Sequence, residues 1–338
     1  MTTVSAPPSP ALFFETVNAY QRTAALKAGV DLGVFTVIGR GVESPSEIAV
    51  ECGAPERGIR VLCDFLVICG LIVKANGAYR LTPDSAMFLN ASSPAYLGGT
   101  LDLLLGRDIS GPIQNLSAVV RHGGPLEPEE STTAPEHPVW VTFARAMMPF
   151  MMPTAAQIAD LIPFAAEQPV KVLDIAAGHG IFGLSFARKY PQAQITALDW
   201  PQVLEVAQEN AARFGVADRY STLPGNAFDV PLGDGYDVVL LTNFLHHFDP
   251  QTNEGLLNRV HAALKPGGKA VTLEFIPNED RVTPPRDAGF ALIMLATTQA
   301  GDAYTYGQLE SMFRAAGFAS STMHEMPGSG SRVVVSVA

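Results

Sequence analysis

Short apolar runs alternate with helically spaced segments through the second half of this chain. Residues 170–175 and 195–198 are apolar runs, rich in β-branched side chains and of the length expected for buried strands. Between them, residues 181–189 repeat apolar side chains at helical spacing, and Pro191 follows as a stop signal. This order predicts a strand–helix–strand unit, and the helical crossover predicts a parallel sheet.

The same patterns continue toward the end of the chain. Met294 lies in one further helical segment, where it either contacts a ligand or packs in the core. Alternating strands and helices of this kind predict an α/β domain over residues 166–338. The remaining strands are predicted at residues 220–223, 236–241, 269–275, 320–323 and 333–337, and the remaining helices at residues 204–214, 290–298 and 309–316.

The first hundred residues show helical spacing, followed by a hairpin signal. We expect Gly29 to end the first helix, Asp31 to cap the second, and a Ser44–Glu47 capping box to open the third. Two short strands surround Asn76–Gly77, a pair typical of a type I′ turn. Helices followed by a hairpin indicate a winged-helix module over residues 11–105. Its helices are predicted at residues 11–27, 31–38, 44–52 and 55–69.

Residues 1–10 form a polar, Pro-rich tail that we expect to be disordered, and residues 106–165 connect the two domains. Helices are predicted at residues 96–105, near 113–121 and over 139–161. The last should kink or break at Pro149 and Pro153. Its crowded Met, Phe and Trp side chains are consistent with core packing and equally with an adaptable apolar pocket for a flat substrate.

Composition narrows the possible partners of the 338-residue chain. A formal net charge of −11 argues against nucleic acids and anionic membranes as main partners, and no apolar run is long enough for a membrane span. The presumed recognition helix of the winged-helix module carries only Arg57 and Arg60 as basic residues, so we expect burial against a second subunit instead of DNA binding. Three cysteines without metal-binding spacing predict free thiols, no metal site and a cytoplasmic location.

The glycine turn after the first strand of the α/β domain carries candidate chemistry. Gly178 and Gly180 lack Cβ atoms where a ligand would touch the backbone, and Asp199 ends the next strand, where a carboxylate can bind ribose hydroxyls. With Gly183 the turn also matches G-x-G-x-x-G, the pattern of a dinucleotide site. Asp174 precedes the turn, and a carboxylate there suits a cationic amino acid and opposes a pyrophosphate.

Motifs in both predicted domains carry a family resemblance. D-I-A-A-G-H-G, then L-D, then L-K-P-G-G-K-A-V-T-L-E resemble the class I methyltransferases that depend on S-adenosylmethionine. The winged-helix module, with V-D-L-G-V-F and L-T-P, is similar to that of plant and bacterial small-molecule O-methyltransferases of the caffeate and acetylserotonin type. The resemblance implies a Rossmann-like, mostly parallel seven-stranded sheet closed by an antiparallel hairpin. It also implies an α-rich N-terminal domain that forms a homodimer.

The resemblance also implies which residues bind the methyl donor. The family shows G-D-x-F after the third strand, with the acid near the adenine amino group, whereas this chain has Asn226 at that position. An amide oxygen can still accept from that amine, and Phe228 could flank the adenine. The implied donor-binding residues are Asp174, Gly178, Gly180, Asp199, Trp200, Asn226, Ala227, Phe228 and Thr242.

For catalysis, His246 falls where the family has its general base, and Glu274 where it has an acid that orients the histidine. A histidine satisfied by loop hydrogen bonds is the alternative interpretation. His247 stands where the family has an acid. A second family acid is missing at Ala303; the neighbouring Asp302 is a candidate substitute, and whether it replaces that acid is left open. These departures keep three activities open on a small aromatic or polyketide-like substrate: O-methylation, C- or N-methylation, and a non-methylating descendant that binds the donor.

Overall fold

The computed structural model describes residues 7–127 and 131–338, and the chain divides into two compact units, Met1–Leu101 and Asp102–Ala338. Most of the expected disordered tail, residues 1–6, lies outside the described residues. Among the described helices, none combines the length and the apolar content that crossing a membrane requires.

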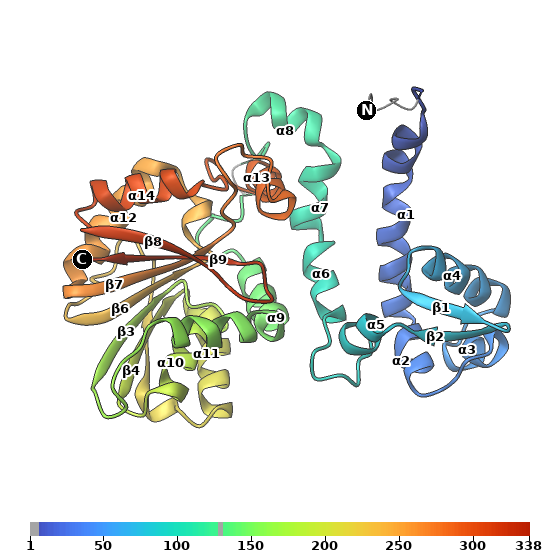
Figure 1. Ribbon diagram of the computed structural model, residues 1–338, viewed down its shortest axis with the longest axis horizontal. Helices are drawn as coiled ribbons and strands as arrows, with labels where there is room; N and C mark the ends of the chain where they lie inside the picture. The colour runs from blue at the N-terminus through green and yellow to red at the C-terminus, as the bar shows by residue number, and fades with distance from the viewer. Residues whose placement is uncertain (1–6, 128–130) are drawn as a thin grey trace, which may run out of the picture. The chain divides into compact units, whose positions relative to one another are not determined.

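The first unit is a helical bundle with a two-stranded hairpin (Figure 1). Its core is made by side chains from four helices and both strands, including Phe35, Ile48, Ile59 and Tyr79. Its elements are α1 (Ala11–Asp31), α2 (Val34–Gly39), α3 (Pro45–Glu51), α4 (Glu56–Ile68), β1 (Ile72–Ala75), β2 (Ala78–Leu81), α5 (Pro83–Phe88) and η1 (Gly98–Thr100).

The hairpin confirms the predicted turn, because Asn76 and Gly77 both have positive φ, at 52° and 81°. The Ser44 hydroxyl oxygen accepts from the Glu47 N–H at 3.3 Å, as expected of an N-cap. The reciprocal half of the capping box differs, since the Glu47 carboxylate accepts from the Ser44 hydroxyl, at 2.5 Å, and not from its backbone.

The first helix boundary was wrong in the sequence prediction. α1 continues through Gly29 to Asp31, so Asp31 does not cap the second helix, and α2 instead follows Gly33, whose φ is 70°. Gly29 serves packing: an added Cβ would lie 2.8 Å from Cε2 of Phe35. Close approach of two helices can require glycine as readily as a helix end does.

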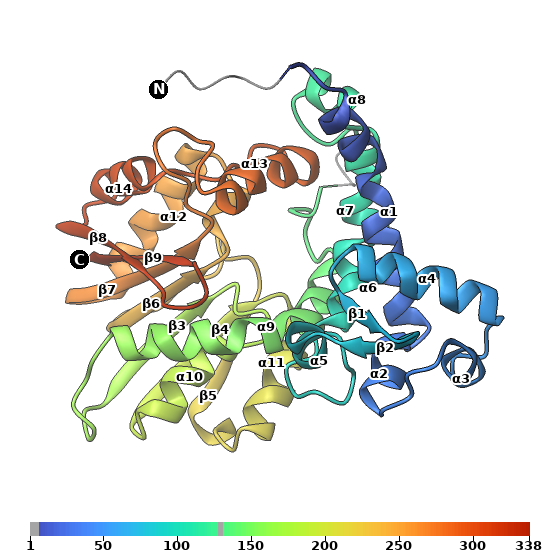
Figure 2. The same cartoon turned by 45° about the vertical axis from the view of Figure 1, so that its right-hand side comes forward.

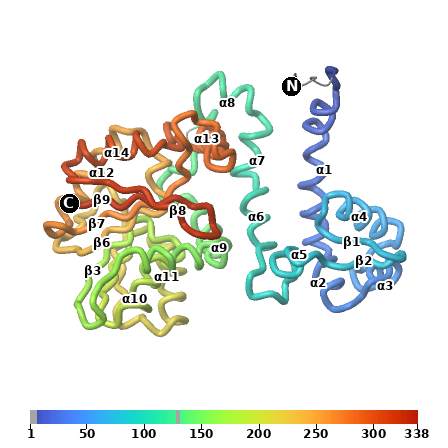
Figure 3. The backbone as a smooth tube through the Cα atoms, viewed as in Figure 1, coloured from blue at the N-terminus to red at the C-terminus, as the bar shows by residue number. Residues whose placement is uncertain are grey.

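The second unit is an α/β domain around a seven-stranded sheet of order β5-β4-β3-β6-β7-β9-β8. The first five of these strands are parallel, and β9 is antiparallel to both β7 and β8. Figure 3 shows the backbone of the C-terminal hairpin, which β8 and β9 form; β9 lies between β7 and β8 in the sheet. The predicted fold class is confirmed. The strands are β3 (Val170–Ile175), β4 (Ala193–Asp199), β5 (Tyr220–Pro224), β6 (Tyr236–Thr242), β7 (Leu264–Glu274), β8 (Ser320–Glu325) and β9 (Arg332–Val337).

Helices cover both faces of this sheet (Figure 2). On one face α9 (Val139–Leu161), α10 (Ile181–Lys189) and α11 (Pro201–Arg213) pack on the strands, and on the other α12 (Pro250–Ala263) and α14 (Tyr306–Ala315) do so. Fully buried Phe186 of α10 and Phe313 of α14 belong to the two cores. The remaining helices are α6 (Leu101–Leu104), α7 (Arg107–Gln114), α8 (Leu116–His122), η3 (Ala217–Arg219), η4 (Leu245–His247) and α13 (Pro285–Thr297).

The segment before the sheet departs from its predicted pattern. In place of the helix predicted over residues 96–105, η1 and the short α6 are found, and α7 and α8 meet at Asn115 where one helix over 113–121 was expected. α9 runs unbroken through Pro149 and Pro153. A proline costs a helix one hydrogen bond, but the buried face of α9 packs against α10 and the sheet, and this packing outweighs that loss. Met147, Met148, Met151 and Met152 belong to the same packed layer.

Candidate active site

The polar residues singled out in the sequence gather at the carboxyl ends of β3, β4 and β6. Strand order reverses beside β3, and ligands of open parallel sheets bind in the crevice left by such a reversal. The turn after β3 has left-handed backbone at Ala176, Gly178 and Gly180, with φ of 54°, 58° and 76°. Within the described structure, an added Cβ on Gly178 would meet only the Ala176 carbonyl oxygen, at 3.9 Å. A ligand can therefore approach the backbone closely at Gly178. The prediction for Gly180 differs from the structure, because an added Cβ there would lie 2.5 Å from the Tyr220 hydroxyl oxygen, so Gly180 serves packing.

Asp199 ends β4, and its carboxylate binds the glycine turn. Its Oδ2 accepts from the Gly178 N–H at 2.8 Å, and its Oδ1 accepts from the Trp200 N–H at 2.7 Å. Burial raises the pKa of Asp199 to about 6, and the two amide donors oppose that shift. Each carboxylate oxygen has a second lone pair, so Asp199 can also accept from hydroxyl groups of a ligand.

Asp174 is fully buried beneath the same turn. Its Oδ2 accepts from the Gly183 N–H at 2.9 Å, whereas its Oδ1 has no hydrogen-bond partner among the described residues. Burial raises the pKa of Asp174 to about 8; the Gly183 amide opposes this shift and the nearby Asp199 adds to it. Gly183 itself serves packing, because an added Cβ would lie 2.7 Å from Cγ2 of Ile195. The free Oδ1 is suited to a cationic or N–H-bearing group.

Asn226 follows β5, and its side-chain amide makes hydrogen bonds within the turn that contains it. Oδ1 accepts from the Phe228 N–H at 3.1 Å, and Nδ2 donates to Asp229 at 2.7 Å. Ala227 is buried, and Phe228 packs edge-on against Phe248, with 4.8 Å between ring centroids. Thr242 is buried at the end of β6, and Trp200 is half-buried after β4. Contact of these residues with a methyl donor stays a prediction.

His246 lies in η4, directly after β6, and faces the end of β7. Its Nδ1 contacts Oε2 of Glu274, and both side chains are buried, with 4% and 5% of their residue surface exposed. The other carboxylate oxygen, Oε1, accepts from the N–H groups of Phe244 at 3.0 Å, Leu245 at 2.8 Å and His246 at 3.3 Å. Since a carboxylate can only accept, this contact places the proton on Nδ1 and leaves Nε2 able to accept another.

Aromatic rings surround the two histidines. The Phe290 ring on α13 lies 4.9 Å from that of His246 and stacks on Phe275 at 3.8 Å. The His247 ring lies 4.2 Å from that of His246, and Trp140 of α9 meets His247 edge-on at 5.1 Å. Burial and the neighbouring His246 hold the pKa of His247 well below its ordinary range. The result is a wall of flat, apolar side chains beside a paired histidine.

Asp302 does not take over the role of the missing family acid directly. Its two carboxylate oxygens lie 2.8 and 2.7 Å from Nη2 of Arg281, and Oδ1 also accepts from the Ala303 N–H at 2.8 Å. The contact of Asp302 with His246 is made by its backbone N–H, which donates to the His246 carbonyl oxygen at 2.9 Å. Ala303, the next residue of the same segment, is buried.

Sequence reasoning missed two residues of the site, His179 and Phe290. His179 is buried within the glycine turn, where its Nδ1 accepts from the Ile181 N–H at 3.2 Å and so caps α10; burial lowers the pKa of His179 to about 4. The position of this histidine before a helix start was the available signal. Phe290 was assigned to an apolar helix without a role, and Met294 is buried in the structure. Phe290 faces His246 because of tertiary packing, which a local sequence pattern does not predict.

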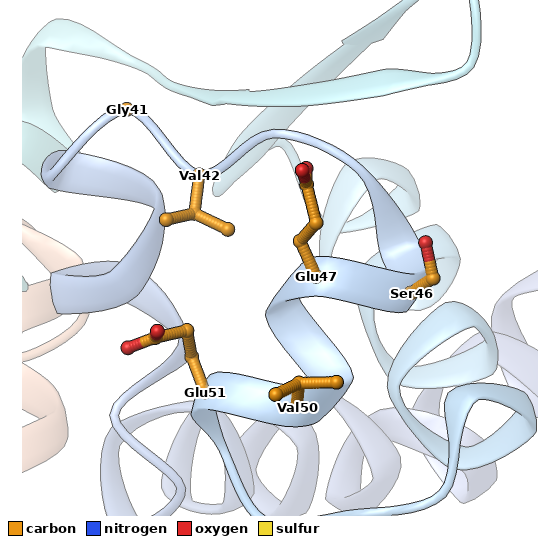
Figure 4. A pocket seen from close by; sticks show the side chains of 6 residues that line it. All are labelled: Gly41, Val42, Ser46, Glu47, Val50 and Glu51. Atoms are coloured by element: carbon orange, nitrogen blue, oxygen red, sulfur yellow. The ribbon is translucent and has the colours of Figure 1, made fainter.

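A hollow of about 510 Å³ on the first unit does not offer comparable chemistry (Figure 4). Its two acids are already engaged, since Glu47 accepts from the Ser44 hydroxyl and Glu51 pairs with Arg40 at 2.7 Å. The hollow is lined by Gly41, Val42, Ser46, Glu47, Val50 and Glu51. The described residues contain no group of three or more His, Cys, Asp or Glu that could hold a metal ion. The candidate active site is therefore the one in the second unit.

Comparison with protein families gives two matches. Residues 142–319 match the O-methyltransferase domain, and residues 14–91 match the O-methyltransferase dimerisation domain. Together the two matches span both units of the chain.

Individual proteins agree with these matches. The crystal structure of a proposed O-methyltransferase from Nostoc punctiforme PCC 73102 is 51% identical, covers 98% of this chain and 100% of its own, and gives a TM-score of 0.94. The 3-hydroxy-5-methyl-1-naphthoate 3-O-methyltransferase of Streptomyces sahachiroi is 27% identical over 91% of this chain and 89% of its own. Human N-acetylserotonin methyltransferase in complex with SAM shares the fold, with a TM-score of 0.83, 22% identity, and coverage of 100% of this chain and 99% of its own.

Proposed function

The chain belongs to the O-methyltransferase family, and from that premise we propose that it methylates a hydroxyl group of a small aromatic or polyketide-like molecule, with His246 as general base. S-adenosylmethionine-dependent O-methylation of a small molecule is the activity that the family and its relatives assign to the chain. The aromatic acceptor is supported by the rings around His246 and by the substrate that the name of the Streptomyces sahachiroi relative gives, a naphthoate.

The main support for this proposal is the contact of Glu274 with His246. One carboxylate oxygen holds three backbone amides of the histidine loop and the other holds Nδ1, so the ring and its tautomer are fixed together. His246 then has Nε2 free to take the proton of an acceptor hydroxyl, and the charge that it gains faces a carboxylate. A histidine that served only to satisfy its loop would not need a buried carboxylate on its ring.

The glycine turn fits the cofactor. S-adenosylmethionine supplies a methyl group already activated on a sulfonium, so positioning should account for most of the acceleration. Asp174 Oδ1, which lacks a hydrogen-bond partner in the described part of the chain, would accept from the donor's ammonium group. Asp199 would hold the ribose hydroxyls, and Gly178 would admit the ligand against the backbone. Asn226, Ala227 and Phe228 would flank the adenine.

Proton affinity constrains the acceptor. An ordinary phenol and an ordinary histidine differ by about 3.5 pKa units, so complete proton transfer before attack would cost roughly 5 kcal/mol. We therefore expect the proton to move in concert with methyl transfer, or the acceptor to be an acidified phenol with a neighbouring carbonyl group.

Two other activities on the same fold remain alternatives. A carbon or nitrogen acceptor needs no histidine base, and the absence of an acid at position 303 is consistent with that chemistry. A descendant that binds the donor without transferring methyl groups would keep the glycine turn and lose the reaction.

Transfer of a labelled methyl group tests the proposal. Wild type is incubated with labelled S-adenosylmethionine and a panel of phenols, naphthols with an ortho carbonyl group, anilines and carbon nucleophiles, and the products are identified by mass spectrometry. We expect methyl ethers, and we expect their formation to depend on His246. N- or C-methylated products alone would contradict O-methylation, and donor binding without any transfer would favour the non-methylating alternative.

We also propose that the chain acts as a homodimer formed by its N-terminal domain, and that it works in the cytoplasm. The match of residues 14–91 to the dimerisation domain supports the first of these, and the free thiols Cys52, Cys63 and Cys69 are consistent with the second.

A further inference from the structure

The loop that carries His246 is held from outside by the segment between α13 and α14. The Asp302 N–H donates to the His246 carbonyl oxygen at 2.9 Å. The Tyr304 hydroxyl, on a side chain that is almost fully buried, donates to the carbonyl oxygen of Phe248 at 2.5 Å. Residues 301–304 therefore bind the backbone of this loop at two points on either side of His247.

Gly301 allows this approach. An added Cβ would overlap the His246 carbonyl oxygen and lie 3.0 Å from the carbonyl carbon of His247. These are backbone atoms, which cannot rotate aside as a side-chain end can. The Gly301 N–H also donates to the Thr298 hydroxyl oxygen at 2.9 Å, which fixes the segment to the end of α13. Any larger residue at position 301 would push the loop and the segment apart.

The far side of the segment is anchored by charge. Arg281 Nη2 contacts both oxygens of the Asp302 carboxylate, and Arg281 Nη1 donates to Oε1 of Gln308 at 3.2 Å. Since Asp302 Oδ1 also accepts from the Ala303 N–H, this carboxylate organises the backbone of the segment. It thereby presents the Asp302 N–H to the His246 carbonyl oxygen.

We propose that residues 301–304 position His246 for catalysis through these backbone contacts, in the place where the family resemblance leads us to expect an acid and this chain has Ala303. The inference rests on the proposed role of His246 as the base. Gly301, Asp302 and Tyr304 are positioning residues: they act on the loop and not on the substrate. Glu274 holds the ring and three N–H groups of the loop, and residues 301–304 bind the loop's carbonyl oxygens at His246 and Phe248.

Histidine NMR tests the positioning without any acceptor. In protein labelled with ¹⁵N-histidine, the ring signals of His246 are assigned by their loss in His246→Gln, and the wild type should show one tautomer with the proton on Nδ1. We expect Gly301→Ala to give a mixture of tautomers or exchange-broadened signals. Gly255→Ala is the matched control, because an added Cβ on α12 meets no described atom within 4 Å. An unchanged His246 spectrum in folded Gly301→Ala would overturn the inference.

Kinetics provides a second test that is less disruptive to the fold. Tyr304→Phe removes the hydroxyl that binds the loop, whereas Tyr306→Phe removes a hydroxyl that donates to the Ser321 carbonyl oxygen at 2.8 Å, away from the loop. With the acceptor found in the labelled-methyl screen, we expect Tyr304→Phe to lower kcat about fivefold and Gly301→Ala to lower it about 100-fold, at unchanged donor affinity. Tyr306→Phe should stay near wild type.

A double-mutant comparison separates positioning from general damage. If residues 301–304 act through His246, Tyr304→Phe should have no further effect on kcat once His246→Ala is present. Equal effects in both backgrounds would contradict the inference. If His246→Ala leaves kcat unchanged, the proposal that His246 is the base is wrong. If His246→Ala lowers kcat but Tyr304→Phe has the same kcat as Tyr306→Phe, only the positioning role of residues 301–304 is wrong.

Discussion

Asp174 shows how a single buried carboxyl group can couple donor binding to stability. Its ordinary pKa is 3.8, and burial raises the pKa to about 8 in the folded chain. The folded state therefore binds this proton more tightly than the unfolded state does. The resulting contribution to stability is fully present below the unfolded pKa and is lost as the pH rises through the folded pKa. A cation placed against Oδ1 would favour the ionised form and offset that loss.

Asp174→Asn tests this coupling at the residue scale. The amide oxygen can still accept from the Gly183 N–H, but the side chain has no proton to lose. Between about pH 5 and about pH 8, the free energy of unfolding without donor should fall less in the variant than in wild type. Donor affinity should fall at least about tenfold, because the charged partner of the ammonium group is gone. Urea unfolding and calorimetry measure the two effects.

Asp218→Asn, which alters an exposed carboxylate in η3, is the control and should follow wild type in both measurements. Parallel pH curves for wild type and Asp174→Asn, with equal donor affinity, would contradict the assigned environment of Asp174.

At the scale of elements, α13 places the Phe290 ring beside His246, where we propose that the acceptor binds. Phe290→Leu keeps an apolar side chain but removes the ring that stacks on Phe275 and meets His246. Aromatic contacts of this kind contribute about 0.5–1.5 kcal/mol, so kcat/KM for an aromatic acceptor should fall roughly twofold to twelvefold. Leu292→Ala on the same helix, at a side chain 43% exposed, is the control and should change kcat/KM little. Equal steady-state parameters for Phe290→Leu and wild type would remove α13 from the acceptor site.

Local patterns in the sequence predicted most elements of the α/β domain. The glycine turn, the helix over Ile181–Lys189 and the final hairpin all occur as expected, because each is specified by residues close together in the chain. Where prediction failed, tertiary contacts decided. Gly29 was predicted to end the first helix, but it lies within α1, where its missing side chain leaves room for Phe35. α9 continues through two prolines because its buried face covers the sheet. α12 was absent from the predictions although Asp249 caps it, accepting from the Thr252 N–H at 3.0 Å.

The part of the candidate site that could be predicted from the sequence is the part that the family resemblance covers. His246 and Glu274 were expected together, and the structure brings them into contact across 28 positions of the chain. The family resemblance supplied this pairing, since no local spacing relates the two residues. Asp302 was a candidate substitute for the acid missing at position 303, and its contact with His246 is made by a backbone N–H and not by the carboxylate. A backbone contact leaves no trace in residue type, so sequence reasoning could not find it.

At the scale of the whole molecule, the N-terminal half of α1 exposes large apolar side chains. Such a set is costly to leave in water and typical of an interface. The match to the O-methyltransferase dimerisation domain covers the same residues from position 14 onward. The exposed residues are Leu12, Phe13, Phe14, Val17 and Tyr20, with exposed fractions between 52% and 74%.

Charge on this surface should prevent dimer formation. Phe14→Glu combined with Val17→Glu would bury two unpaired carboxylates in the proposed interface, so light scattering after size-exclusion chromatography should give the mass of a monomer where wild type gives a dimer. Val50→Glu places the same charge on an apolar side chain of α3 that is 81% exposed, and should remain dimeric. A doubly substituted chain that still elutes as a dimer would place the interface elsewhere.

The most direct test of the central claim is the methyl-transfer rate of His246→Ala at saturating donor, with the acceptor found in the screen. If His246 is the base that its contact with Glu274 suggests, its removal should lower kcat by about 100-fold or more, with donor affinity and unfolding temperature preserved. A decrease of less than about threefold in folded, donor-binding protein would contradict a general base at this position. Methyl transfer would then depend on positioning of donor and acceptor alone.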